Sequence, residues 1–300
     1  MKAIVMAKHG SPDGLQLQEV EKPIPRDHEV LIRVYAATVV RGDVILRRLH
    51  PLLQIVFQLF GIRRKRIPGH EFAGEIEEVG SRVTRFKEGD PVFGTTTGLS
   101  VGANAEYVCL PEVWGKGVLG AKPANMTYEE AAAIPVGGMT ALFLLRRANV
   151  QSGQKVLIYG ASGSVGTFAV QLAKYYDAEV TGVCSTANIE LVKSLGADAT
   201  IDYTKEDFTQ NGQTYDVIFD AVGKISSSRC KGSLKEAGRY VSVRFSTNEK
   251  TENLNHLKEL AEAGKIHAVI DRRYPLGQTA EAHRHVETGR KKGNVVITVA

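Results

Sequence analysis

The chain has 300 residues, enough for about two domains, and its hydrophobic fraction of 43% and charged fraction of 24% exclude a disordered or fibrous protein. Its net charge of +5 is mild, so we expect no nucleic-acid partner. No apolar run is long enough to span a bilayer, and polar residues follow Met6, so we expect neither a signal peptide nor a membrane partner.

Cysteine usage indicates the compartment. Cys109, Cys184 and Cys230 are few, odd in number and widely spaced, which fits free thiols in a reducing environment better than a disulfide framework. We therefore expect a cytoplasmic protein.

The first half of the chain shows the period-two alternation of strands. Examples are Glu29 to Val39 and Phe72 to Val79, and turn signals at Gly89-Asp90-Pro91 and Gly102-Ala103-Asn104 separate such segments. This pattern predicts a mostly antiparallel, barrel-like domain.

One N-terminal segment differs from its surroundings. Pro51 can open a helix that is apolar nearly all round from Leu52 to Phe60, and the basic run Arg63 to Arg66 follows. Three hypotheses remain open for the helix: a buried core helix, a lid or wall of a lipophilic substrate pocket, and a membrane-surface contact. The basic run is interpreted as a solvated patch, with nucleic-acid contact as the alternative.

A strand, a turn of small residues and a helix follow one another in the middle of the chain. The apolar run Val156 to Tyr159 precedes Gly160, and a helical pattern runs from Thr167 to Lys174. Small residues let the backbone approach a diphosphate, and the N–H groups and dipole of the helix start hold its charge. We therefore predict a nucleotide site, against the alternative of an ordinary strand-to-helix turn. Its residues are Ala161, Ser162, Gly163, Ser164, Val165 and Gly166.

From Lys155 onward, strand and helix patterns alternate with short connections, which predicts an α/β fold with a doubly wound parallel sheet. The predicted strands are Val156 to Tyr159, Glu179 to Cys184, Ala199 to Ile201, Asp216 to Asp220 and Arg239 to Val243. The predicted helices are Ser164 to Tyr176, Asn188 to Leu195, Lys205 to Thr209 and Ser226 to Glu236. The tail Gly293 to Val299 is strand-like again and can return to the first domain.

Five ordered motifs now carry a family resemblance. They are Pro68 to Gly74, Phe86 to Gly94, Ala131 to Ala141, the glycine turn, and Tyr215 to Gly223. With them the chain resembles the medium-chain dehydrogenase/reductase superfamily, in its zinc-independent quinone oxidoreductase-like branch. The resemblance implies a GroES-like catalytic domain of residues 1–124 and 266–300, a Rossmann cofactor-binding domain of residues 125–265, and an active site in the cleft between them.

The resemblance also allows a test for zinc. Zinc-dependent members supply a cysteine just before the segment corresponding to Gly42-Asp43, a histidine in the glycine-His-Glu motif and a further cysteine. Only His70 is present, because Val39, Val40 and Arg41 occupy the first region and Pro135 to Thr140 contains no cysteine. We expect no metal site, and we interpret His70 as a structural or hydrogen-bonding residue.

Without a Lewis acid, reduction of a conjugated carbonyl is easier than oxidation of a simple alcohol. The resemblance implies that the nicotinamide delivers a hydride to a lipophilic quinone or enone. The substrate oxygen is then protonated, and water is one candidate proton donor. Candidate catalytic residues are Asp43, Arg41 and Thr140, of which Thr140 also belongs to the cofactor site. Each has an alternative: Asp43 as a helix cap, Arg41 as a surface cation, and Thr140 as an ordinary helix residue.

Coenzyme choice depends on the end of the second Rossmann strand, where NAD enzymes usually carry an acid. Cys184, Ser185 and Thr186 stand there instead, so repulsion of a 2′-phosphate is absent and two hydroxyls can donate to it. NADPH is favoured, and NADH remains open because Ala187 replaces an arginine that is frequent in relatives. Tyr203 and Val222 complete the expected cofactor site, and Lys174 resembles a position near the adenosine end.

The region Arg244 to Thr251 is shorter than in the relatives. Because that region helps to pair subunits in the family, the family-type homodimer is in doubt. Three rival functions stay open: a zinc-free alcohol or aldehyde reductase of the same fold, a nucleotide-bound structural or RNA-binding protein, and a membrane-associated protein using Leu52 to Phe60.

Overall fold

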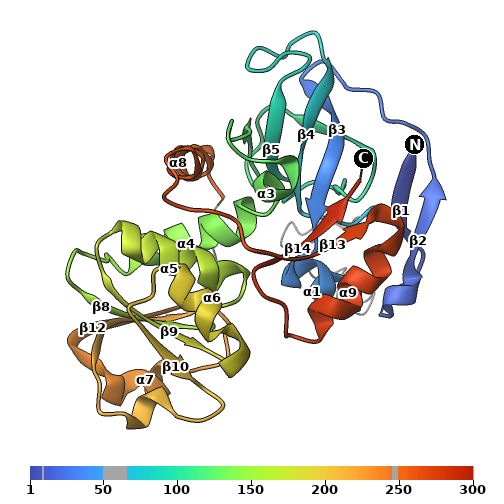
Figure 1. Cartoon of the computed structure of the whole chain (residues 1–300). Helices are drawn as coiled ribbons and strands as arrows, with labels where there is room; N and C mark the ends of the chain where they lie inside the picture. The colour runs from blue at the N-terminus through green and yellow to red at the C-terminus, as the bar shows by residue number, and fades with distance from the viewer. Residues whose placement is uncertain (9, 50–65, 245–248, 300) are drawn as a thin grey trace. The chain divides into compact units, whose positions relative to one another are not determined.

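The computed structural model describes residues 1–300 except residues 9, 50–65, 245–248 and 300, and Figure 1 gives the chain trace. The hypotheses about Leu52 to Phe60 and about the basic run up to Lys65 lie outside the described residues, as does the middle of the shortened region. The chain forms two compact units: Met1–Pro135 with Glu249–Glu262 and Ile270–Ala300, and Val136–Asn248 with Ala263–Val269.

The first unit is built on a mostly antiparallel sheet, as expected. Its seven described strands run in the order β13-β14-β3-β4-β5-β7, with β6 paired to β3. The bounds are β3 Glu29–Thr38, β4 Glu71–Val79, β5 Pro91–Thr95, β6 Tyr107–Pro111, β7 Leu119–Ala121, β13 Ile270–Pro275 and β14 Asn294–Thr298. β14 pairs with β3, so the tail does return to the first domain.

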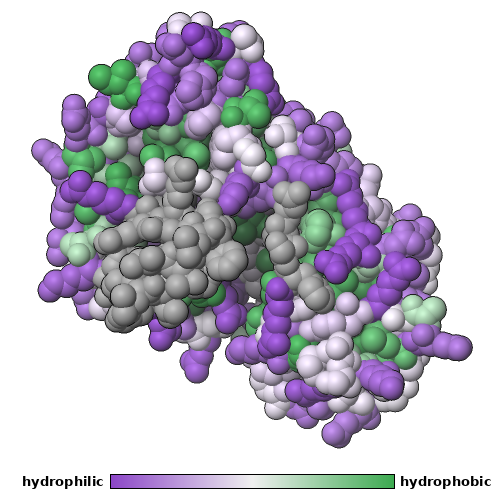
Figure 2. All heavy atoms as spheres, turned by 180° about the vertical axis from the view of Figure 1, so that it is seen from behind, coloured by the Kyte–Doolittle hydropathy of each residue, from purple (hydrophilic) through white to green (hydrophobic). Residues whose placement is uncertain are grey.

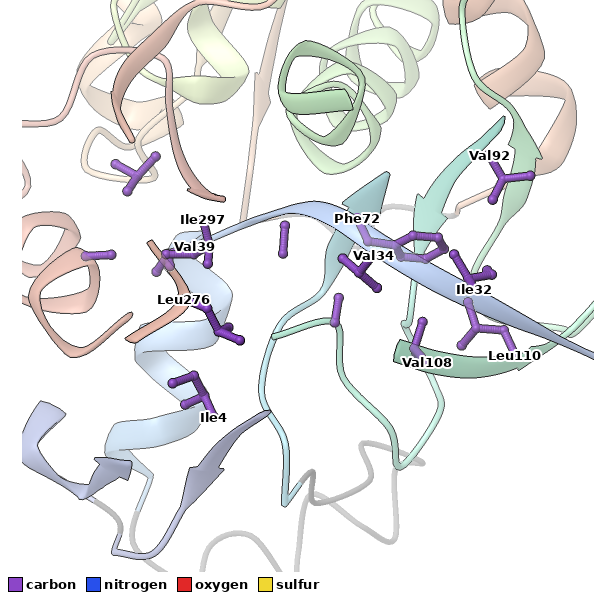
Figure 3. Close-up of a cluster of buried hydrophobic side chains, with 14 of the residues drawn as sticks. Ile4, Ile32, Val34, Val39, Phe72, Val92, Val108, Leu110, Leu276 and Ile297 are labelled. Carbon is purple, nitrogen blue, oxygen red and sulfur yellow. The ribbon is translucent and has the colours of Figure 1, made fainter. Parts of the chain in front are cut away.

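A two-stranded sheet and four helices complete this unit in the described residues. They are β1 (Lys2–Met6), β2 (Leu15–Glu19), α1 (Arg41–Arg48), α3 (Tyr128–Ala132), α8 (Thr251–Glu262) and α9 (Thr279–Glu287). Alternate residues of β3 point inward, which is why Val30, Ile32 and Val34 are fully buried. Figure 3 shows this core, in which Ile32 and Val34 lie near Phe72, Val108 and Leu110, so burial of these apolar side chains holds the sheet together.

The second unit contains the predicted parallel sheet. In the described residues its order is β10-β9-β8-β11-β12, with every pair parallel. The strands are β8 Lys155–Tyr159, β9 Glu179–Cys184, β10 Ala199–Asp202, β11 Tyr215–Asp220 and β12 Leu234–Ser242. The helices are α4 Pro135–Arg147, α5 Ser164–Tyr175, α6 Ile189–Ser194 and α7 Ser227–Cys230. α5 and α6 lie on one side of the sheet and α7 on the other (Figure 1), so the doubly wound prediction is confirmed.

Two predicted helices are wrong. Residues 205–209 form no α-helix, because the carboxylate of Asp207 accepts the N–H of Thr209 in a local turn that competes with a helix, and a 3-10 turn follows at Phe208–Gln210. The helix predicted to reach Glu236 ends at Cys230, and after a short 3-10 turn β12 begins at Leu234. The strand β12 therefore includes Leu234 to Glu236, which the sequence pattern had assigned to a helix.

The helix α8 groups with the first unit, whereas the residues before and after it group with the second, and the expected boundaries at 124/125 and 265/266 stay a prediction. α8 belongs to the first unit, because Leu254 packs so closely on β7 that a Cβ at Gly120 would lie 3.1 Å from it. The side chain of Asn125 donates to the carbonyl of Ala261 at the end of α8 at 3.0 Å. The second unit is therefore interrupted by α8 rather than continuous.

The surface is largely polar. Figure 2 shows one face on which hydrophilic residues cover most of the described area and apolar ones are scattered. Exposed large apolar side chains such as Ile24, Val113 and Tyr203 are far apart in the sequence. Among the described helices, none has both the length and the apolar character needed to cross a membrane.

Candidate cofactor site

The site starts at the turn between β8 and α5. Gly160 has a φ of +82°, which favours glycine, and a Cβ there would lie 2.2 Å from Cγ2 of Val222. The N–H groups of Gly160 and Ala161 both donate to the carbonyl of Val183 at 3.0 Å. The end of β9 and the residue after β11 therefore hold the turn from two sides, and Val222 acts through packing against Gly160.

The next two glycines have different tasks. A Cβ on Gly163 would meet nothing nearer than the carbonyl oxygen of Gly160 at 3.6 Å, so the space in front of the helix start is open. A Cβ on Gly166 would lie 2.1 Å from that same oxygen, so Gly166 permits close packing of α5 on the turn. An open cradle at the N-terminus of a helix fits a diphosphate, because the first N–H groups and the dipole face it. Ser162, Gly163, Ser164 and Val165 are partly accessible, whereas Ala161 and Gly166 are buried.

Thr140 comes to this turn from α4. Three residues earlier in that helix, a Cβ at Gly137 would lie 2.7 Å from Oγ of Ser164, so α4 and α5 pack closely where α5 begins. Residues three apart share a helix face. Thr140, which is half-buried, thus stands on the face of α4 that meets the turn.

The end of β9 differs from the sequence-based expectation. Cys184 is buried, and the amide of Asn188 donates to Ser162 Oγ at 3.1 Å and Ser185 Oγ at 3.2 Å, which ties the turn to the strand end. Thr186, expected to donate to a 2′-phosphate, donates its hydroxyl hydrogen to Asp202 instead. Lys174 is bound to Asp198 at 2.9 Å. Asp202 was missed because it stands at the end of a different strand.

A pocket of about 300 Å³ opens beside the turn at the carboxyl ends of the parallel strands. Tyr159 and Val183 line it, and these residues directly precede Gly160 and Cys184. The other lining residues are Tyr203, Thr204, Lys205, Glu206, Asp207, Phe208 and Arg229. Ligands of open α/β sheets bind outside the carboxyl ends of the strands, so this pocket fits the adenosine part of a dinucleotide. Tyr203 was expected there, whereas Tyr159 and Phe208 were missed.

In the first unit, Asp43 is a buried carboxylate with two fixed partners. One oxygen accepts the N–H of Val40 at 2.9 Å at the start of α1, and the other lies 2.5 Å from Nδ1 of His70. Burial raises the pKa of Asp43, but His70, together with His283 and the N–H of Val40, more than offsets this and leaves the pKa below its ordinary value. The helix-cap interpretation of Asp43 and the hydrogen-bonding interpretation of His70 both match this geometry. Arg41 is exposed at the first residue of α1.

The arrangement of possible metal ligands agrees with the small number of cysteines in the sequence. Among the described residues, no group of three or more His, Cys, Asp or Glu side chains is arranged to hold a metal ion. Cys109, Cys184 and Cys230 are free thiols, of which the last two are buried.

The chain matches two described families. Residues 26–141 match the alcohol dehydrogenase GroES-like domain and residues 164–270 match the zinc-binding dehydrogenase domain. It is 35% identical to the 2-methylene-furan-3-one reductase of Solanum lycopersicum, and 32% identical to the NADPH-dependent alkenal/one oxidoreductase, chloroplastic, of Arabidopsis thaliana. Each match covers 99% of this chain and 79% of the relative.

Solved structures agree with these matches. The quinone oxidoreductase from Coxiella burnetii superposes with a TM-score of 0.89 at 29% identity, covering 100% of this chain and 99% of that one. The chain therefore belongs to the medium-chain dehydrogenase/reductase superfamily, which confirms both the resemblance and the fold of a GroES-like domain with a Rossmann domain.

Proposed function

We propose that this protein is an NADPH-preferring, zinc-independent oxidoreductase that reduces quinones or other conjugated carbonyls. The observation that carries the proposal is the open cradle at Gly163, directly beside the pocket at the carboxyl ends of β8 and β9. The relatives add support, since their names describe reductases of alkenals, alkenones, a methylene-furanone and quinones that use NADPH or NAD(P)H.

The residues have separate tasks in binding. The backbone of Ala161 to Gly166 receives the diphosphate, and the pocket lined by Tyr159, Tyr203 and Phe208 receives the adenosine end. Thr140, on the face of α4 that meets the turn, contacts the coenzyme near its nicotinamide end, and Val222 keeps the turn in place. NADPH, when bound, supplies the hydride. The protein aligns the coenzyme with the acceptor and excludes water.

Proton transfer to the substrate oxygen is assigned to His70. Its Nδ1 faces Asp43, and its side chain is 17% exposed. Within the described residues, its Nε2 makes no hydrogen bond. A carboxylate that fixes one ring nitrogen leaves the other nitrogen as the group that exchanges a proton. Asp43 is therefore a positioning residue, and the exposed Arg41 at the start of α1 stays a candidate contact to the substrate.

Zinc independence rests on the ligand set. His70 is engaged by Asp43, and the described residues near it include no cysteine, since Val39 and Val40 precede α1. Soft thiolate ligands are the usual companions of a histidine at a zinc site of this superfamily's zinc-dependent members. Metal analysis of the purified protein by mass spectrometry tests this directly.

Location and partners belong to the same proposal. Three free thiols favour a reducing compartment, and we assign the protein to the cytoplasm, although several relatives are named chloroplastic or mitochondrial. Fractionation of cells that express a tagged full-length chain tests the location.

The partner is a small lipophilic carbonyl compound rather than nucleic acid or a membrane. In the described residues the parallel sheet ends at β12, and light scattering decides between monomer and homodimer.

The function is tested by titrating the protein with NADPH and NADH, then following coenzyme oxidation with a quinone, an enone and a simple aldehyde, each with and without a chelator. Turnover of the quinone or enone, unaffected by the chelator, is expected. Turnover of the aldehyde alone would favour the rival zinc-free alcohol or aldehyde reductase. Coenzyme binding without any turnover would favour a non-enzymatic role.

A further inference from the structure

The strand β10 of the parallel sheet ends in the buried acid Asp202, whose hydrogen-bond partner Thr204 lines the proposed coenzyme site. We propose that Asp202 and Lys205 set the coenzyme preference of this protein: Lys205 binds the 2′-phosphate of NADPH, and the charge of Asp202 limits that preference so that NADH is also accepted. This inference rests on the proposed function and concerns the adenosine end of the same site.

Asp202 is fixed by several donors. Its carboxylate accepts the hydroxyl hydrogen of Thr186, and it accepts the hydroxyl of Thr204 at 2.6 Å and the backbone N–H of Thr204 at 3.0 Å. In the sheet, Asp202 pairs with Cys184, so its side chain stands level with the end of β9. NAD enzymes usually carry an acid at the end of the strand that corresponds to β9. Here the neighbouring strand β10 places Asp202 beside that position.

The first consequence concerns Thr186. A hydroxyl has one hydrogen, and Thr186 gives it to Asp202, so this oxygen presents lone pairs toward a phosphate rather than a donor. Ser185 differs, because its oxygen accepts the amide of Asn188 and keeps its own hydrogen available. Of the two hydroxyls at the end of β9, Ser185 is therefore the donor to the coenzyme.

The second consequence concerns charge. The hydrogen bonds from Thr186 and Thr204 lower the pKa of Asp202 to about 2, so the carboxylate is ionised at any working pH. A phosphate placed against the hydroxyl oxygen of Thr186 would stand about two oxygen–oxygen contact distances, roughly 5–6 Å, from that carboxylate. Two like charges at this separation repel each other, and the 2′-phosphate of NADPH is penalised whereas the 2′-hydroxyl of NADH is not.

Lys205 supplies the opposing attraction. The pocket is lined by two cations, Lys205 and Arg229. Arg229 is bound to Asp207 at 2.8 Å, whereas Nζ of Lys205 lies 3.6 Å from Asp202 and its side chain is 68% exposed. Lys205 can therefore turn to a phosphate without breaking a close ion pair, and Asp202 keeps it at the edge of the pocket.

The test uses two fragments that differ only in the 2′-phosphate, adenosine 2′,5′-bisphosphate and 5′-AMP, with binding to the full chain measured by isothermal titration calorimetry. Asp202→Asn keeps an oxygen acceptor for Thr204 and removes the charge, so affinity for the bisphosphate is expected to rise about tenfold, with 5′-AMP changed less than about twofold. Lys205→Gln is expected to lower bisphosphate affinity about tenfold and to leave 5′-AMP unchanged.

Glu236→Gln is the matched control, because this exposed acid on β12 is not among the residues that line the pocket, and a change below about threefold is expected. The inference is overturned if Asp202→Asn alters both fragments equally or neither, or if Glu236→Gln reproduces its effect. An unchanged bisphosphate affinity in Lys205→Gln, an exposed position where folding is not at risk, overturns the role of Lys205. If neither fragment nor NADPH binds the wild-type chain, the proposed function itself fails.

Discussion

Gly166 presses against Gly160: a Cβ placed on Gly166 would lie 2.1 Å from the carbonyl oxygen of Gly160 and 2.8 Å from the Cα of Ala161. The contact joins the first turn of α5 to the glycine turn that follows β8.

Replacing Gly166 with Ala is therefore expected to destabilise the protein by about 1–3 kcal/mol, the usual cost of forcing extra volume into a packed site. Urea unfolding followed by circular dichroism measures the change. Gly232→Ala is the control, since nothing lies within 4 Å of its Cβ position. Equal stability of the two variants would mean that α5 does not rest on the turn as described.

Gly163 gives the opposite prediction. The space in front of it is open, so Gly163→Asp should fold with near wild-type stability, while its carboxylate occupies and repels the diphosphate position. NADPH affinity should fall roughly hundredfold or more, measured by quenching of intrinsic fluorescence, with Gly232→Asp binding normally. Retained affinity in Gly163→Asp would show that the diphosphate lies elsewhere.

The pair of Asp43 and His70 tests the proposed proton transfer. His70→Gln should lower kcat with a quinone or enone about 100-fold, within the range for loss of a general acid, and leave the dissociation constant of NADPH within about twofold. Asp43→Asn should give a smaller loss, because the ring keeps a hydrogen-bond partner. His256→Gln, a change on α8, serves as control. An unchanged kcat in His70→Gln would reduce the pair to a structural role.

Acid should destabilise the first unit through His283. This side chain is buried, and within the described part of the chain neither ring nitrogen has a hydrogen-bond partner. Burial lowers the pKa of His283 from 6.5 to about 4. The negative charges of Asp43 and Glu287 raise this pKa, and the positive charge of Arg47 lowers it further. Because the unfolded chain binds the proton more tightly, stability is full above pH 6.5 and falls as the pH drops toward 4, by about 3 kcal/mol.

Urea unfolding at half-unit pH steps measures this dependence, and His283→Leu should flatten it over the same interval. Carboxylates such as Asp43, whose pKa is below its ordinary value, contribute only at lower pH, so they do not obscure the effect. An unchanged slope in His283→Leu would assign the acid sensitivity to other groups.

The three cysteines should react slowly. Burial raises the pKa of Cys184 and Cys230 to about 11, and burial with nearby carboxylates raises that of Cys109 to about 12. At pH 8 only about one thiol in a thousand or fewer is ionised, and the thiolate is the nucleophile. Iodoacetamide should therefore add nothing to the native protein within minutes and three groups after unfolding, as read by mass spectrometry. Rapid labelling of the native chain would refute this protection. Low thiol reactivity would also protect the protein from covalent modification by electrophilic enone substrates.

Local sequence predicted the second unit well where one element packs simply. β9 matches its predicted bounds, β8 and α5 differ by one residue, and the turn between them carries its signal in contiguous small residues. The predictions failed at residues 205–209 and 231–236. At residues 205–209 the side chain of Asp207 accepts a local backbone N–H and competes with the helix, and at residues 231–236 the pairing of Leu234 with Tyr215 on β11 favours a strand. Neither hydrogen bond is visible in the hydrophobic periodicity of the sequence.

The amino-acid sequence alone determined the superfamily, the glycine turn between β8 and α5 and the alternation of strands and helices, because each of these depends on contiguous residues whose backbone preferences act locally. Tertiary structure decided which polar groups meet: Asp43 with His70 across 27 positions, Thr186 with Asp202 across 16, and α8 with β7 in the first unit. Such pairs depend on strand register and helix packing, which bring distant residues within hydrogen-bonding range only after the chain has folded.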